Sequence, residues 1–367
     1  MKRRNLLTAF GTTGLAAALS PLTLRAQASL NAQEDQAKSR AAKALKDQLE
    51  QGRISPGAGE LTQMPTPARL YRDLEGTIDL HVHTIPDGFP RLMDDIETVA
   101  QAKAAKMRAV MLKCHVVPTP DRAYIAQRAV GGGIQVFGLI CLNTPVGGMN
   151  PEAVRMAIRM GAKAVWMPSM WAENHARYVR ESQKSMGYET LGMEFPNPGE
   201  TILTNDGEMK PAVKEILKLV ADHDLQLSTG HLSLKEAHLL VDEASKMGIK
   251  KLIVHTVNYH VLHYPLEDQK RMVEKGAFLE FGFSSLPYPI WEPVDPKRRI
   301  SLDDVVTSMR AVGVEHCIIT TDSGQVSSPP PVECMRLWIE LLKTKGFKSE
   351  EIDCMAKTNP AKLLGLA

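Results

Sequence analysis

Eight short apolar segments alternate with segments that carry helix-start and helix-stop signals, from residue 77 to the end of the chain. Each has the length and the β-branched content of a buried strand: 77–83, 109–116, 135–142, 163–168, 225–230, 251–256, 277–283 and 316–321. Repeated strand–helix units predict an α/β fold, the (β/α)8 TIM barrel, in which a ring of parallel strands lies inside a ring of helices.

A doubly wound open sheet is the competing architecture. It would need a glycine-rich turn after the first strand to bind a nucleotide phosphate. Residues 83–88 read His-Thr-Ile-Pro-Asp-Gly and lack that pattern, so the barrel is the favoured fold.

Helix boundaries between the strands are marked by capping residues. Asn150-Pro151 predicts a helix start and Gly161 its end. Capping-box pairs are predicted at Ser233 with Glu236 and at Ser301 with Asp304. Ser349 is predicted to open the last helix, which we expect to end before Pro360.

The first 28 residues read as a targeting segment. Lys2-Arg3-Arg4 precedes a mildly apolar run, and Ala26-Gln27-Ala28 fits a cleavage site with small residues. The paired arginines resemble a twin-arginine export signal, with the general secretory route or a retained anchor as alternatives. We therefore expect a periplasmic or secreted protein with a linker and N-terminal arm at 29–70 and the barrel at 71–367.

Composition limits the partners. The net charge is +2, and no cluster of Lys and Arg in the body of the chain indicates nucleic-acid binding. No segment of the body is long and apolar enough for an ordinary membrane helix, so no membrane contact is expected beyond export. The expected partner is a small-molecule substrate, and the sequence leaves open whether copies of the chain form a homo-oligomer.

Histidines gather where the predicted strands end, which is where barrel active sites lie. His81 and His83 alternate along the first strand and therefore face the same way. The other polar residues near strand ends are His115, His231, His255 and Asp322. Imidazoles and a carboxylate on one rim predict a site for a divalent metal ion.

These residues resemble the metal-binding signature of the amidohydrolase superfamily. Four short motifs resemble a poorly characterised branch of it: Lys113-Cys114-His115, Val165 to Pro168, Gly230 to Ser233, and Thr321 to Gln325. The resemblance implies a barrel of the metal-dependent hydrolase type with metal ligands His81, His83, His231, His255 and Asp322. It also implies that Asp322 is the base that takes a proton from a metal-activated water.

The fourth strand departs from the two-metal members of that superfamily. Those members often carry a bridging carboxylated Lys or a Glu there, but Lys163 lies at the wrong end of 163–168. One ion is therefore favoured over two, with His255 contacting water or substrate. With two ions, His231 and His255 would bind the second. Zn²⁺ is the expected metal, and Mn²⁺, Fe²⁺ and Ni²⁺ are alternatives.

The remaining candidates admit more than one role. Lys113 could bridge metals or stabilise charge, contact a substrate carboxylate or oxyanion, or form a structural ion pair. His255 and Lys113 join Asp322 as candidate catalytic residues. Glu280 could be an acid, a bridge or the buried partner of Lys113. The predicted substrate-binding residues are His115, Trp166, Asn143, Glu280 and Gln325. Four other histidines are expected to have surface or packing roles: His175, His223, His238 and His316.

The sequence thus predicts a metal-dependent hydrolase that cleaves an amide, imide, lactone or ester bond in a small molecule. A metal-dependent decarboxylase or other lyase could use the same site. A third alternative, from another class, is a periplasmic binding protein that lacks turnover.

Overall fold

A computed structural model describes residues 71–181, 197–286 and 300–366. All of them belong to one compact unit, Pro67–Ala367. The predicted export signal at 1–28 and the linker at 29–70 lie outside the described residues. Within these three ranges, no helix has the length and hydropathy that crossing a membrane requires.

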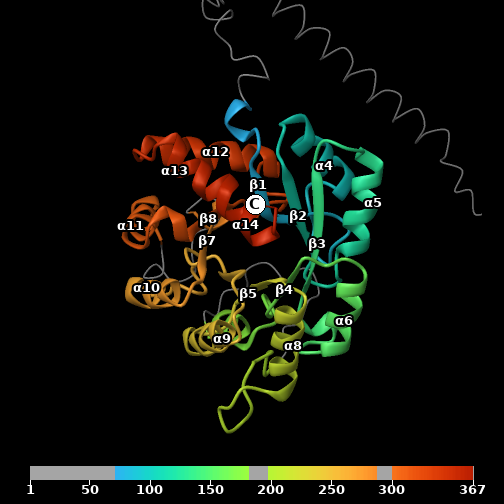
Figure 1. The fold of residues 1–367 in the computed structure, drawn as a ribbon, viewed down its shortest axis with the longest axis vertical. Helices are drawn as coiled ribbons and strands as arrows, with labels where there is room; N and C mark the ends of the chain where they lie inside the picture. The colour runs from blue at the N-terminus through green and yellow to red at the C-terminus, as the bar shows by residue number, and fades with distance from the viewer. Residues whose placement is uncertain (1–70, 182–196, 287–299, 367) are drawn as a thin grey trace, which may run out of the picture. The chain divides into compact units, whose positions relative to one another are not determined.

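The described residues contain eight parallel strands whose order in the sheet follows their order in the chain (Figure 1). They are β1 Ile78–His83, β2 Ala109–Lys113, β3 Gln135–Cys141, β4 Ala164–Trp166, β5 Gln226–Ser228, β6 Leu252–Val254, β7 Phe278–Gly282 and β8 Cys317–Thr320. The first and last strands meet, because Asp322 N donates to His81 O at 2.9 Å and His83 N donates to Ser323 O at 2.8 Å. The (β/α)8 barrel predicted from the sequence is confirmed.

Helices follow the strands and surround them in Figure 1. The α-helices are α4 Asp95–Ala104, α5 Pro120–Val130, α6 Pro151–Arg159, α7 Glu173–Glu181, α8 Pro211–Asp222, α9 Leu234–Lys246, α10 Leu266–Glu274, α11 Leu302–Val312, α12 Pro331–Thr344, α13 Ser349–Asp353 and α14 Asn359–Leu364. Shorter turns are η1 Arg72–Leu74, η2 Thr144–Val146, η4 Phe283–Ser285, η6 Val314–His316 and the π-helical η7 Cys354–Thr358.

The predicted caps form at three helix starts. The side chains of Asn150, Ser233 and Ser301 each accept a hydrogen bond from a backbone N–H in the first turn of the helix that follows. The prediction that the last helix stops before Pro360 is wrong. The chain stays helical to Leu364, because η7 widens into a π turn and Pro360 falls in the first turn of α14, where its missing N–H costs nothing.

One end of the barrel is closed by α14. Apolar side chains inside the ring, such as Ile78, Met111 and Ile318, form a buried cluster with Ala361 and Leu363. Figure 1 shows α14 over the middle of the barrel, beside β1. Because that end is filled with apolar side chains, the polar residues at the C-terminal ends of the strands lie at the opposite end of the barrel.

Candidate metal centre

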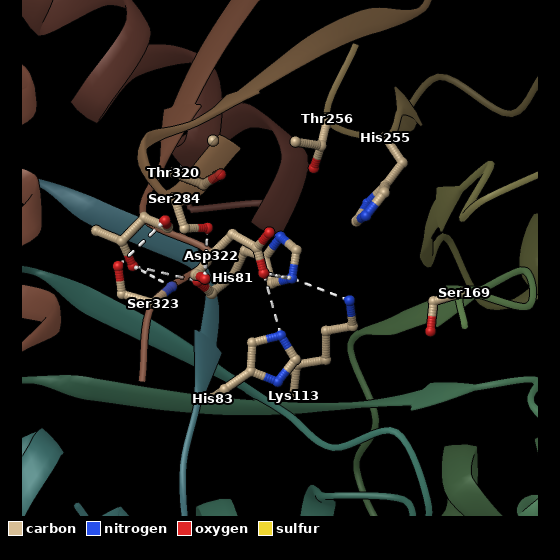
Figure 2. Close-up of polar contacts among 12 residues, drawn as sticks. His81, His83, Lys113, Ser169, His255, Thr256, Ser284, Thr320, Asp322 and Ser323 are labelled. Atoms are coloured by element: carbon tan, nitrogen blue, oxygen red, sulfur yellow. Dashed lines mark hydrogen bonds and ion pairs between the residues drawn. The ribbon is translucent and has the colours of Figure 1, made fainter. Parts of the chain in front are cut away.

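Two histidines from β1 and an aspartate that follows β8 converge on one point. His81 Nε2 lies 2.9 Å and His83 Nε2 3.1 Å from the same oxygen, Asp322 Oδ1 (Figure 2). Burial raises the pKa of Asp322, but the neighbouring imidazoles of His81 and His83 outweigh it and hold that pKa well below its usual range. The carboxyl group is therefore ionised at neutral pH.

The turn after β8 places Asp322 in an uncommon backbone conformation. Its φ is +48°, in the left-handed region that few residues other than glycine adopt. The turn is held by Ser284 Oγ and Gln325 Nε2, which donate to the carbonyl of Asp322 at 2.7 and 2.9 Å. Gly324 has φ +126°, and a Cβ there would lie 1.9 Å from His83 O. Strain of this kind is typical of functional sites.

Glu280 on β7 lies behind two of the histidines. Its Oε1 is 2.7 Å from His81 Nδ1, and its Oε2 is 2.9 Å from His255 Nδ1. Thr320 Oγ1 and Thr256 N also donate to this carboxylate. Burial raises the pKa of Glu280, but the charges of the two imidazoles outweigh it, and the pKa lies well below its usual range. With both Nδ1 atoms facing a carboxylate, the Nε2 atoms of His81 and His255 are left to face the centre.

His231 and His255 approach each other on the other side of the centre, with their Nε2 atoms 3.2 Å apart. Behind His231, its Nδ1 lies 2.7 Å from Nδ1 of His175, and the two rings stack with centroids 4.9 Å apart. His175 comes from α7 and is buried, and burial lowers its pKa to about 3. No pattern in the sequence predicts this contact, because His175 lies in helix α7 and not at a strand end.

Lys113, at the end of β2, points into the centre (Figure 2). It is 1% exposed, and its Nζ lies 2.9 Å from His81 Nε2 and 4.6 Å from the centroid of the Trp166 ring. Burial lowers the pKa of Lys113. Among the described residues, Lys113 and Glu280 form no ion pair within 4.0 Å, so the alternative of a buried pair between them does not hold: the carboxylate contacts the two imidazoles instead.

The other predicted substrate contacts lie around this centre. His115 stacks on His83 with ring centroids 4.8 Å apart, and its Nδ1 is 2.9 Å from Ser169 Oγ. Asn143 is fully buried and donates to His115 O and Ser169 Oγ, so it supports His115 from behind. Trp166 is also fully buried, and its ring packs edge-on against His81.

Within the described ranges, two groups of side chains could hold a metal ion: His81 with His83 and Asp322, and His81 with His255 and Glu280. In the second group the carboxylate oxygens lie at hydrogen-bond distance from Nδ1 atoms, an arrangement typical of support behind metal ligands. In the first group two Nε2 atoms and a carboxylate oxygen converge, which is a donor set that suits Zn²⁺ and similar ions. The residues present therefore fit a divalent cation at the first group.

A protein-family model described as "Family of unknown function (DUF6282)" matches residues 76–280. The chain belongs to this family. The match to DUF6282 begins before β1 and ends within β7, so it includes the four histidines of the centre and Glu280. Asp322 and the turn that holds it lie beyond the matched residues.

A search of curated proteins finds no match to this DUF6282 chain. Among solved structures, a protein provisionally assigned as 2-pyrone-4,6-dicarboxylic acid hydrolase from Pseudomonas putida matches with a TM-score of 0.52 and 13% identity, over 79% of this chain and 98% of that one. Organophosphorus hydrolase from Deinococcus radiodurans matches with a TM-score of 0.49 and 13% identity, over 79% and 92%. 2,6-Dihydroxybenzoate decarboxylase from Rhizobium matches with a TM-score of 0.43 and 10% identity, over 80% and 99%. The likeness to the first establishes a shared barrel fold.

Proposed function

We propose that this chain is a metal-dependent hydrolase of the amidohydrolase superfamily that cleaves an amide, imide, lactone or ester bond in a small molecule. The observation that carries the proposal is the convergence of His81 Nε2 and His83 Nε2 on Asp322 Oδ1. The Pseudomonas putida protein of the same fold is also named a hydrolase. Fold alone does not determine chemistry, so the proposal depends on the side chains.

We propose one Zn²⁺ held by His81, His83, His231 and Asp322, with His255 contacting water or substrate. A divalent cation bound there supplies Lewis acidity and lowers the pKa of a coordinated water. Glu280 fixes the tautomer of His81, because its carboxylate accepts from Nδ1 and leaves the Nε2 lone pair for the ligand position.

Asp322 has the properties of a general base. Its side chain is 20% exposed, whereas that of Glu280 is 1% exposed and faces away from the rim. Since the Asp322 carboxylate is ionised at neutral pH, it can accept a proton from the attacking water and return it to the leaving group. Lys113 can place positive charge beside the carbonyl oxygen on which negative charge develops.

The buried amine of Lys113 also gives a reason to consider decarboxylation, since a cation in the centre could hold a substrate carboxylate. The two reactions differ in the oxygen of the product. Hydrolysis in ¹⁸O-labelled water puts solvent oxygen into the product, whereas decarboxylation does not require it.

We also propose that residues 1–28 direct twin-arginine export to the periplasm. In the double variant Arg3→Lys/Arg4→Lys, the precursor is expected to stay in the cytoplasm, as measured by cell fractionation. Unchanged export of that variant would refute this route.

The test of the proposed activity combines metal analysis with turnover. The protein is expressed in medium supplemented with Zn²⁺ and purified. Its bound metal is then measured, and its turnover is screened against lactones, imides, amides and esters. Asp322→Asn is expected to lower turnover per bound metal by about 10²- to 10⁴-fold. Asp222→Asn, at an exposed ion pair on α8, is the matched control and should leave turnover unchanged. Absence of any bound transition metal, or equal turnover by wild type and Asp322→Asn, would count against the proposal.

A further inference from the structure

The loop between β1 and α4 carries a buried arginine beside the metal centre. The side chain of Arg91 is 5% exposed, and its Nε and Nη2 lie 2.8 and 2.7 Å from a single oxygen, Asp87 Oδ2. The Asp87 side chain is itself fully buried, and its other oxygen accepts from Gly88 N. Asp87 therefore fixes the orientation of the guanidinium group.

This arrangement leaves part of the guanidinium fork unused. Arginine has five N–H donors, and in the part of the chain that the structure describes the Nη1 group of Arg91 takes part in no hydrogen bond or ion pair. A fixed planar fork with open N–H groups suits a carboxylate, which can accept two hydrogen bonds side by side.

Arg91 also lies close to the residues of the centre. Its backbone pairs with Gln325, and Leu92 N donates to Gly324 O at 2.8 Å, so this loop runs along the turn that holds Asp322. The partner oxygen Asp87 Oδ2 is 4.0 Å from His83 Nδ1.

An apolar wall stands next to the guanidinium group. Arg91 Cζ lies 5.5 Å from the centroid of the Phe89 ring, and Phe89 in turn packs edge-on against His115 at 5.5 Å and Trp171 at 6.3 Å. Phe89, Met170 and Trp171 form a buried apolar cluster of their own, separate from the clusters of the barrel. A ligand with its carboxylate on Arg91 would therefore have apolar surface beside its body.

A bound metal would change the charge balance around the centre. Among the described residues, four carboxylates and two cationic side chains lie around it: Asp79, Asp87, Glu280, Asp322, Arg91 and Lys113. A single divalent cation offsets the excess of two negative charges. The loaded site therefore repels an anionic ligand less than the site without metal does.

We propose that Arg91 and the apolar cluster of Phe89, Met170 and Trp171 form a carboxylate subsite, so that the substrate is a small carboxylic acid with an apolar body. As a statement about the substrate, this rests on the proposed hydrolase function. As a statement about binding, it can be tested without turnover.

Benzoate and its neutral analogue benzamide are the probes, and calorimetry on the full metal-loaded chain measures their affinities. Wild type is expected to bind benzoate at least tenfold more tightly than benzamide. Because Arg91→Gln alone leaves Asp87 buried and unpaired, the double variant Asp87→Asn/Arg91→Gln removes both charges together. It should lose at least tenfold in benzoate affinity and little in benzamide affinity. Arg128→Gln, which removes one positive charge from α5, is the control and should bind both probes like wild type.

Two results would overturn the subsite. One is equal affinity of wild type for benzoate and benzamide. The other is an unchanged benzoate affinity in a folded double variant, with folding checked by thermal melting.

Turnover separates this inference from the proposed function. A lactone that bears a carboxylate is compared with its methyl ester. Hydrolysis of both at equal rates, unaffected by the double variant, would support the hydrolase and refute the subsite. Tight benzoate binding that depends on Arg91, with no hydrolysis of any substrate tested, would support the subsite and refute the hydrolase.

Discussion

Replacing Glu280 by Gln tests whether this side chain sets the tautomers of two metal-site histidines. The carboxylate presents one oxygen to His81 Nδ1 at 2.7 Å and the other to His255 Nδ1 at 2.9 Å. A glutamine has one acceptor oxygen and one NH₂ group, so it can accept from only one of the two rings. The other imidazole must move its proton to Nε2, which removes the lone pair that faces the centre.

The expected loss of Zn²⁺ affinity follows because one of the two histidines no longer has an acceptor for its Nδ1 proton. Mutating a partner behind a metal-bound histidine typically lowers metal affinity by about 10- to 100-fold, or about 1.4 to 2.7 kcal/mol. We expect Glu280→Gln to bind Zn²⁺ that much more weakly, as measured by competition with a chromophoric chelator at pH 7. The fold should persist, because the amide oxygen can still accept from one of the two donors, Thr320 Oγ1 or Thr256 N, which bind different oxygens of Glu280.

Asp79→Asn is the matched control. Asp79 is also a buried carboxyl group, but it accepts from the backbone of His81 and from the N and Oγ1 atoms of Thr321, and it touches no imidazole. An asparagine can keep the backbone contacts, so Zn²⁺ affinity should stay within about threefold of wild type. If Glu280→Gln binds Zn²⁺ as tightly as wild type, or if Asp79→Asn loses as much, the assignment of Glu280 is wrong.

Two further predictions concern backbone strain and pH. Gly324→Ala should lose about 2 kcal/mol or more of stability and most metal binding, because its Cβ would collide with His83 O. Gly248→Ala is the control, because Gly248 has φ +76° but open space around it, and this variant should lose about 1 kcal/mol of stability. Thermal melting measures the stability of both variants, and an equal loss in the two would contradict this reasoning. Without metal, the protein should lose stability as the pH falls from about 6.5 towards 4, since burial lowers the pKa of His175 to about 3 and of His255 to about 4 while the unfolded chain takes up protons near 6.5. For His255 alone the loss is about 3 kcal/mol by pH 4, and urea unfolding that is independent of pH across this range would refute it.

The strand periodicity was sufficient to predict the barrel, because it depends on local backbone geometry. The place of Asp322 beside His81 and His83 was expected from its position at a strand end and from the resemblance to the amidohydrolase superfamily. The supporting contacts were harder to predict. His175 contacts His231 from a helix, and Arg91 pairs in a loop with Asp87, whose Oδ2 lies 4.0 Å from His83 Nδ1, so neither position follows from a repeat in the sequence. Pro360 misled the prediction of the last helix, since a proline in a first turn and a proline after a helix end look alike in one dimension.

The proposed metal ligands His83 and Asp322 lie near opposite ends of the barrel sequence, which has a consequence for how the barrel folds. A cation shared by His83 and Asp322 would tie the opening strand to the closing one, across a loop of more than two hundred residues. Such a tie cannot form on a nascent chain whose final strand has not yet emerged. Metal binding would then occur only after all eight strands have formed the barrel. Removal of the ion would weaken the contact between β8 and β1 before that of any other strand pair.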